Sequence, residues 1–229
     1  ELFSKHVNIA QRVMDDIIDL EMEKIESIMH KIQSDPEDDA IKLTEIQLWE
    51  KIKAKTSEGR RTGVGTTGEG DMLASLGFRY GTDEATDFSE SVHKAVALAA
   101  YRSSVDMAKE RGAFVHYDTQ REANNPFIQR LRDADPVLYK DMVEYGRRNI
   151  ACLTIAPTGT TSIMTQTTSG IEPVFMPVYT RRRKVNPNDR NVRVDFVDDN
   201  GDSWEEYIVF HHKFVTWMVA NGISTTQKY

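Results

Sequence analysis

The chain has 229 residues, of which 39% are hydrophobic and 28% charged, and its formal net charge is −7. The apolar fraction is enough for a sizeable core, whereas an acidic chain binds nucleic acid poorly, since clustered lysines and arginines must replace phosphate counterions there. No run of about eighteen apolar residues indicates a membrane span, so we expect a soluble, cytoplasmic protein that binds neither nucleic acid nor membrane.

Helical spacing of apolar residues dominates the first 147 positions. The expected helices are Phe3–Ser34, 34–57, Thr82–Arg111, Asn124–Arg132 and Pro136–Arg147. Cap residues support these limits: a serine, a proline and acids open the second helix, and Gly112 ends the third. We interpret Asp15, Asp16 and Asp19 as part of a solvated face rather than a carboxylate metal site.

Gly63–Gly68 has the glycine spacing of a dinucleotide-binding turn. Such a turn must follow a buried apolar strand, and the preceding residues 53–61 are mostly polar and charged. We therefore interpret the segment as a turn-and-strand element whose glycines allow close backbone packing.

Strand patterns begin after Asn149. Ile150–Ala156 is a short apolar run with β-branched residues, which predicts a strand buried on both faces inside a parallel sheet or barrel. Val178–Thr180 is a further candidate strand, and 192–197 and 204–210 flank Asn200-Gly201 as a β-hairpin does. A helix from His211 to Ala220 follows. We expect an α/β fold with predominantly helical content.

The turn between the predicted 150–156 strand and a short helix is the strongest candidate site. The first N–H groups of a helix lack intrahelical acceptors and concentrate positive potential, so an anion can bind there. Gly159 lets the main chain approach a ligand, and the hydroxyl-bearing residues are Thr158, Thr160, Thr161 and Ser162. The turn therefore predicts a phosphate site. The alternative is an ordinary strand-to-helix turn whose threonines cap the helix.

Other reactive residue types favour structural interpretations. Cys152 is the single cysteine and lies in an apolar run, where a thiol behaves as a small buried hydrophobe. His211 and His212 point in different directions at a helix start, which favours solvation or a cap interaction over a metal site. The run 181–184 is either a solvated strand edge or a surface for phosphate or an acidic partner. We assign no metal ligand and no catalytic residue.

Three segments together resemble the large subunits of ribonucleotide reductases, in particular the adenosylcobalamin-dependent class. They are Arg148–Ile163, Ser169–Phe175 and Tyr179–Arg182. The glycine turn Arg60–Leu76 and the helical segment Met14–Asp19 resemble the same family in the same order.

The resemblance implies that 1–229 is a fragment of a single catalytic domain, part of a ten-stranded α/β barrel, with 1–147 as its mainly helical half and 148–229 as its strand and phosphate-loop half. In that family the turn matching 158–162 holds the substrate's phosphates, mainly through backbone amides. Nucleoside diphosphate is the implied substrate, and adenosylcobalamin the cofactor of the complete enzyme.

The family reduces the ribose 2′ position by a thiyl-radical mechanism, and the resemblance places its reactive cysteines upstream of the matched segments. Cys152 matches none of them, so we expect this chain alone to be inactive and to need a cysteine-bearing remainder of the catalytic subunit. It would be either a piece of a longer polypeptide or a natural split subunit. Two other classes stay open: a phosphate-binding module, or a helical interaction protein, without reductase chemistry.

Overall fold

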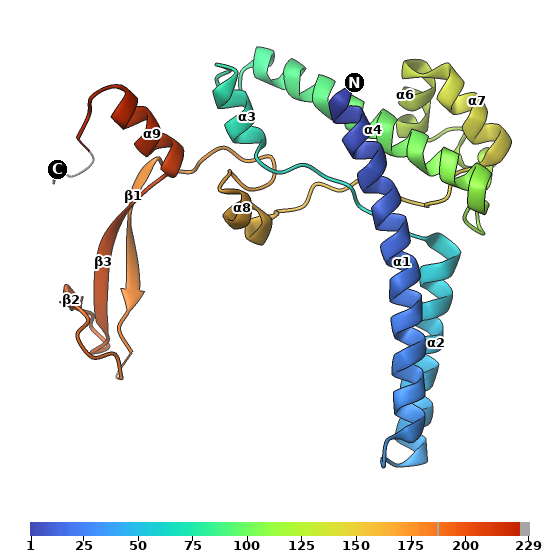
Figure 1. Ribbon diagram of the computed structural model, residues 1–229, viewed down its shortest axis with the longest axis horizontal. Coiled ribbons are helices and arrows are strands. Elements are labelled where there is room, and N and C mark those ends of the chain that lie inside the picture. Colours follow the sequence, from blue (N-terminus) through green and yellow to red (C-terminus); the bar gives the residue numbers. More distant parts are fainter. Residues whose placement is uncertain (187, 225–229) are drawn as a thin grey trace. The chain divides into compact units, whose positions relative to one another are not determined.

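The computed structural model describes residues 1–186 and 188–224. These divide into two compact units, which are described separately (Figure 1). Unit 1 comprises 1–66 and 77–156, and unit 2 comprises 67–76 and 157–229. No helix among the described residues is both long and apolar enough to cross a membrane.

Unit 1 begins with two long helices that lie side by side, α1 (Leu2–Ser34) and α2 (Asp39–Gly59) (Figure 1). Buried residues of α1 recur at intervals of seven, as Ile18, Ile25 and Ile32 do, and this spacing keeps one face of the helix against its neighbours. Asp38 caps α2, because its side chain accepts the N–H of Ala40 at 2.9 Å. The predicted helices are confirmed, although α2 begins a few residues later than expected.

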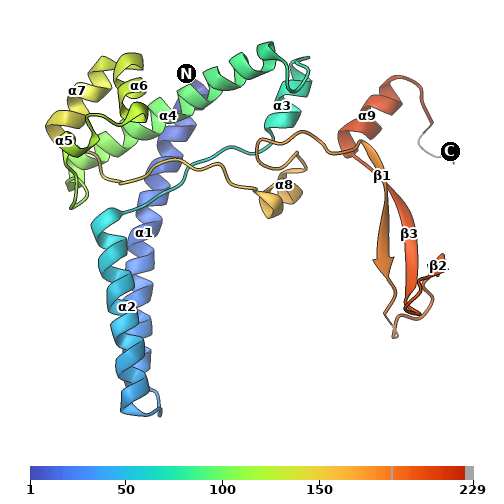
Figure 2. The ribbon, with the colours of Figure 1, turned by 180° about the vertical axis from the view of Figure 1, so that it is seen from behind.

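The remaining helices of unit 1 are α4 (Asp83–Arg111), α5 (Thr119–Glu122), α6 (Pro126–Ala134) and α7 (Pro136–Tyr145) (Figure 2). Thr82 caps α4 and Gly112 ends it with a φ of 86°, a conformation that favours glycine. Only α5 was not predicted. It is a single turn that depends on the Asp118 side chain, which accepts the N–H of Gln120 at 2.9 Å.

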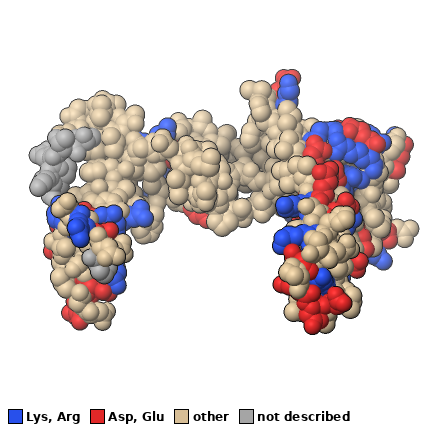
Figure 3. Space-filling view, turned by 60° about the horizontal axis from the view of Figure 1, so that its bottom comes forward, with Lys and Arg blue, Asp and Glu red and all other residues tan. Residues whose placement is uncertain are grey.

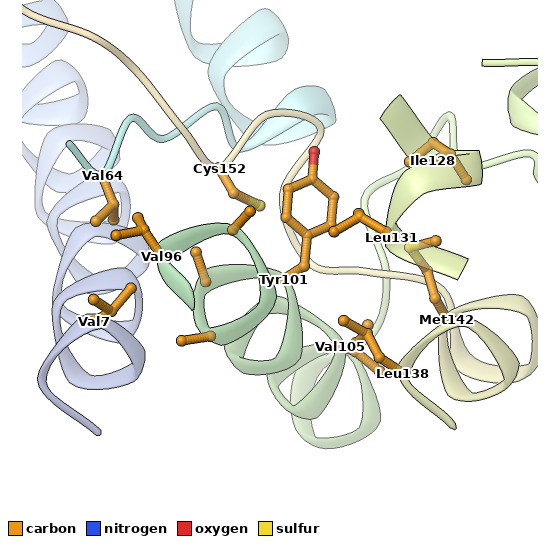
Figure 4. Packing of buried hydrophobic residues seen from close by; sticks show 13 residues of the cluster. Val7, Val64, Val96, Tyr101, Val105, Ile128, Leu131, Leu138, Met142 and Cys152 are labelled. Atoms are coloured by element: carbon orange, nitrogen blue, oxygen red, sulfur yellow. The ribbon is translucent and has the colours of Figure 1, made fainter. Parts of the chain in front are cut away.

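The core of unit 1 lies where α4 packs against α1 and α7 (Figure 4). Ala100 and Val105 of α4 are fully buried, and Leu138 and Met142 of α7 face the same cluster. Cys152 completes the cluster from the segment that follows α7, so this segment is anchored in the core by its side chain.

That segment differs from the prediction of a buried strand. Val64 and Leu153 form an isolated parallel bridge, within which Val64 N–H donates to Cys152 O at 2.8 Å and Thr154 N–H to Val64 O at 3.0 Å. Burial on both faces was wrong, since Cys152 is 1% exposed and Ile155 67%. A strand inside a sheet needs a neighbour on each edge, and the described residues provide one. The ten-stranded barrel is therefore not confirmed.

Unit 2 contains three short helices and a small antiparallel sheet. They are α3 (Glu69–Ser75), α8 (Gly159–Thr165), α9 (His212–Ala220), β1 (Val178–Lys184), β2 (Phe196–Val197) and β3 (Ser203–Phe210). The strand order is β1-β3-β2. The hairpin around Asn200-Gly201 is confirmed, and Gly201 has a φ of 83° in its turn. β1 is longer than predicted and pairs with β3 from Val178–Phe210 to Lys184–Trp204.

Candidate phosphate-binding turn

The predicted phosphate turn begins at Thr158, whose backbone has φ 48° and ψ 32°. Its hydroxyl makes two contacts within unit 2: Oγ1 accepts the N–H of Gly170 at 2.7 Å and lies 2.8 Å from Thr67 Oγ1. Three separate segments therefore meet at this side chain. The Thr158 hydroxyl holds the turn in place rather than standing free for a ligand.

Ser162 makes two hydrogen bonds within the first turn of α8. It is buried, its N–H donates to Thr158 O at 2.8 Å, and its hydroxyl donates to Gly159 O at 2.7 Å. The Ser162 hydroxyl therefore donates its proton to the main chain and not to a ligand. Like Thr158, this predicted site residue shapes the turn.

The other three predicted residues, Gly159, Thr160 and Thr161, are exposed. Their backbone N–H groups have no hydrogen-bond acceptor among the described residues, and the hydroxyls of Thr160 and Thr161 make no hydrogen bond there either. A Cβ added at Gly159 would meet no atom within 4 Å. The start of α8 therefore offers unpaired donors and open space above them, which is what an anion requires.

Part of the glycine-rich segment packs against residues 167–173, which follow the turn in the chain. Gly70 lies so close to the segment after the turn that an added Cβ would come within 2.6 Å of Glu172 O and 2.7 Å of Pro173 Cα. Asp71 and Thr168 are joined twice, since each backbone N–H donates to the other's side-chain oxygen at 3.2 Å. The start of α3 and the 167–173 segment are thereby fixed to each other.

Within unit 1 the same glycine run packs against Thr154. A Cβ at Gly65 would lie 2.6 Å from Thr154 O, and one at Gly63 would lie 3.1 Å from the Thr154 side chain. This confirms the interpretation of close backbone packing.

Three cations of the basic run 181–184 form ion pairs with acids of the same small sheet and its turn. Arg182 pairs with Glu206 at 2.6 Å, Arg183 with Glu205 at 2.8 Å and Lys184 with Asp202 at 2.6 Å. On the face drawn in Figure 3 the positive and negative side chains of this sheet lie close together. These three cations are therefore paired within the chain.

The surroundings of Cys152 and of the pair His211 and His212 indicate structural roles for these residues. Burial raises the pKa of the Cys152 thiol to about 12, so the nucleophilic thiolate is disfavoured, as expected for a small core residue. His211 is the N-cap of α9 without a side-chain cap bond, and its ring centre lies 4.8 Å from that of His212. Among the described residues neither histidine belongs to a cluster that could hold a metal ion.

A buried polar network around Asp15 was not predicted. Asp15 is 0% exposed, and its Oδ1 accepts from Arg60 Nε and from Asn149 Nδ2, both at 2.8 Å. Arg111 and Arg148 approach its other oxygen at 3.4 Å. The solvated-face interpretation is therefore wrong for Asp15. A sequence signal existed, because this acid is four residues from Gln11 and three from Ile18 on the inner face of the helix.

Burial alone would raise the pKa of Asp15, but hydrogen bonds from Arg60 and Asn149, together with the nearby positive charges, outweigh it and lower the pKa. Asp15, Asp16 and Asp19 lie close enough to hold a metal ion. Arginines already pair with all three: Arg111 lies 2.7 Å from Asp16 and Arg60 lies 2.8 Å from Asp19. The cluster is an ion-pair network that runs from the buried Asp15 to the surface, where the side chains of Asp16 and Asp19 are 51% and 46% exposed.

The model of the family described as "Ribonucleotide reductase, barrel domain" matches residues 1–209, and the chain belongs to this family. The relatives are similar at low identity. The vitamin B12-dependent ribonucleoside-diphosphate reductase of Mycobacterium tuberculosis (strain CDC 1551 / Oshkosh) is 28% identical over 176 residues, which cover 76% of this chain and 22% of the relative. The protein of the same name from Thermoplasma acidophilum is 32% identical over 145 residues, which cover 63% of this chain and 16% of the relative.

A third relative, the ribonucleoside-diphosphate reductase subunit alpha of Treponema pallidum, is 26% identical over 128 residues, covering 55% of this chain and 15% of the relative. The matched part is thus about a fifth, or less, of the length of these relatives.

Proposed function

We propose that this chain is a segment of the catalytic subunit of a vitamin B12-dependent ribonucleoside-diphosphate reductase and that its 158–162 turn holds the phosphates of the substrate. Membership of the reductase barrel family and the printed names of the relatives support the first part. The observation that carries the second part is the set of exposed, unpaired N–H groups at Gly159, Thr160 and Thr161.

The proposed contacts divide the turn into two kinds of residue. Gly159, Thr160 and Thr161 would donate main-chain hydrogen bonds to phosphate oxygens, and the two threonine hydroxyls could add further donors. Thr158 and Ser162 would keep those donors aimed outward, since their own hydroxyls are bonded inside the fold. The turn would therefore bind and orient the nucleotide and take no part in breaking its bonds.

The thiol chemistry would come from elsewhere in the enzyme. Reduction of a ribose by thiols needs reactive cysteines, whereas the one cysteine of this chain is buried with a raised pKa. We propose that the chain alone is inactive and acts together with a cysteine-bearing remainder of the subunit, which meets it around the open edge of the 150–156 segment.

Adenosylcobalamin would supply the radical initiation in the complete enzyme. A cavity of about 680 Å³ in unit 1, between α4, α6 and the 153–155 segment, is within the range of sites for drug-sized ligands. A cobalamin is far larger than such ligands. This cavity alone is too small for a cobalamin, so we assign none of the described residues to the cofactor.

The phosphate proposal can be tested with two substitutions in the complete enzyme. Thr160→Pro removes one unpaired N–H at a helix start, where proline is tolerated, and Gly159→Ala adds a methyl group where a phosphate oxygen would lie. Each should raise KM for nucleoside diphosphate about tenfold with a smaller change in kcat, as expected for loss of uniform binding.

Thr165→Ala, at the other end of the same helix, is the matched control and should leave KM unchanged. If KM stays the same in both test variants while the variants remain folded, the turn does not hold the substrate. A nucleotide-binding but inactive complete protein would instead favour the phosphate-binding module.

A further inference from the structure

Thr158, which directly precedes α8, has a backbone conformation that its side chain disfavours. Its φ of 48° and ψ of 32° lie in the left-handed region, where a β-branched residue is rare because its side chain crowds the backbone. Such a conformation persists only where the surrounding contacts hold it. It also sets the direction in which the chain enters α8, and with it the direction of the N–H groups of 159–161. The contacts of Thr158 therefore bear on the proposed phosphate site.

Two threonine hydroxyls form a chain of hydrogen bonds around this residue. Gly170 N–H donates to Thr158 Oγ1 at 2.7 Å, and Thr158 Oγ1 lies 2.8 Å from Thr67 Oγ1. Thr67 Oγ1 in turn donates to Thr168 O at 3.4 Å. All four residues belong to unit 2. The chain of bonds therefore begins and ends in the 168–170 segment and passes through both threonine side chains.

The number of available protons fixes the direction of these bonds. Each hydroxyl has one proton to donate. Among the described residues Thr67 Oγ1 is the one acceptor for the Thr158 hydroxyl, whereas the Thr67 hydroxyl can donate to Thr168 O. Both protons are used only if Thr158 donates to Thr67 and Thr67 donates to Thr168. Hydrogen bonds that run in one direction strengthen each other, so the Thr158 side chain is held firmly.

We propose that Thr67 is a positioning residue for the phosphates of the substrate and that it acts through Thr158. This inference rests on the proposed function of the 158–162 turn. Thr67 Oγ1 accepts the Thr158 hydroxyl and so keeps Thr158 in the left-handed region, with the N–H groups of 159–161 directed outward. Without this acceptor Thr158 can relax to a more favourable conformation, and those N–H groups change direction. Thr67 itself makes no contact with the nucleotide.

Thr67 can hold Thr158 because its own segment is fixed to residues that follow the turn. Gly68 has a φ of 77°, and a Cβ added there would lie 3.2 Å from Thr167 Cβ. Three residues further on, Asp71 N–H donates to Thr168 Oγ1 and Thr168 N–H donates to Asp71 Oδ2, both at 3.2 Å. The Thr67 hydroxyl therefore has a defined position from which to accept the hydrogen bond.

The test is the removal of this hydroxyl in the complete enzyme. Thr67→Val keeps nearly the same side-chain volume and should raise KM for nucleoside diphosphate about five- to tenfold with kcat changed less than about twofold, because misdirected donors weaken uniform binding. Thr67→Ala also lacks the hydroxyl and should give the same result, whereas Thr67→Ser keeps it and should have the parent KM. Thr66→Val is the matched control, since Thr66 is also half-buried and its hydroxyl makes no hydrogen bond with a described residue.

Comparison with Thr160→Pro separates this inference from the function on which it rests. A raised KM in Thr160→Pro, with the parent KM in Thr67→Val and Thr67→Ala, would leave the turn as the phosphate site and overturn the role of Thr67. The parent KM in all three would remove the phosphate site itself. A raised KM that Thr67→Ser shares, or a fall in kcat at the parent KM, would also overturn the positioning role of the hydroxyl.

Discussion

Asn149 uses its whole side-chain amide to join four parts of unit 1. Its Nδ2 donates to Asp15 Oδ1 at 2.8 Å and to Arg60 O at 3.0 Å. Its Oδ1 accepts from Gln11 at 3.0 Å and from Ser104 at 2.9 Å. Among the described residues no buried side-chain polar atom lacks a partner. A network satisfied to this degree fixes one arrangement of its members and penalises removal of any of them.

The buried charge of Asp15 should make stability depend on pH. Its pKa in the folded chain is lowered, so its contribution is fully present above the unfolded pKa, about 4, and is lost as the pH falls through the folded value. Asp15→Asn should cost about 3 kcal/mol at pH 7, because three arginines lose a buried partner. That difference should shrink below about pH 4.

Urea unfolding of both proteins at a series of pH values measures the effect, with the exposed carboxyl change Glu37→Gln as control. The difference in free energy of unfolding between Asp15→Asn and the parent chain could instead stay constant down to the lowest pH of the series. That result would show that the carboxylate charge is not what stabilises the network.

At the scale of an element, the glycines at the starts of α3 and α8 differ in the space available for a side chain. Gly70 lies against backbone atoms at 2.6 and 2.7 Å from an added Cβ, whereas Gly159 faces open space. Gly70→Ala should therefore destabilise unit 2 by about 1–3 kcal/mol through overpacking. Gly159→Ala should be neutral or slightly stabilising, because alanine favours a helix. Thermal unfolding compares the two, and equal effects would contradict the packing described for α3.

Local signals predicted most elements. Caps and apolar spacing gave the limits of α4, α6 and α7 within two residues, since those signals act over one or two helical turns. The length of β1 could not be predicted locally, because it follows from backbone pairing with β3, in which Arg182 lies opposite Glu206 and Lys184 opposite Trp204. The run 150–156 has a strand composition but needs neighbours on both edges, which composition cannot provide.

The candidate turn was predictable in position but only partly in the roles of its residues. A hydroxyl near a helix start can face a ligand or the main chain, and the sequence does not distinguish them. The structure assigns Ser162 to the Gly159 carbonyl and Thr158 to Gly170. The Asp15 network was missed because an acid at a core position is easily taken for the edge of a polar face.

At the scale of the whole molecule, the two units differ in how much apolar surface they bury. Most of the buried hydrophobic residues belong to unit 1, where they form one cluster around α4. In the described part of unit 2 they are Leu73 and Met218. Burial of apolar area is the main favourable term in folding, so unit 2 depends more on hydrogen bonds and exposed ion pairs, which contribute little individually.

Hydrogen exchange of the intact chain should therefore separate the units. Amides of α4 and α7 should exchange last, because their opening exposes the cluster around Val105 and Leu138, whereas those of β1 and β3 should exchange early through local opening. Raising the salt concentration should speed exchange in the sheet more than in α4, since exposed pairs such as Arg183–Glu205 are screened and buried ones are not. Uniform protection across both units would mean that the sheet unfolds only with the core, and the assignment of its stability to surface pairs would fail.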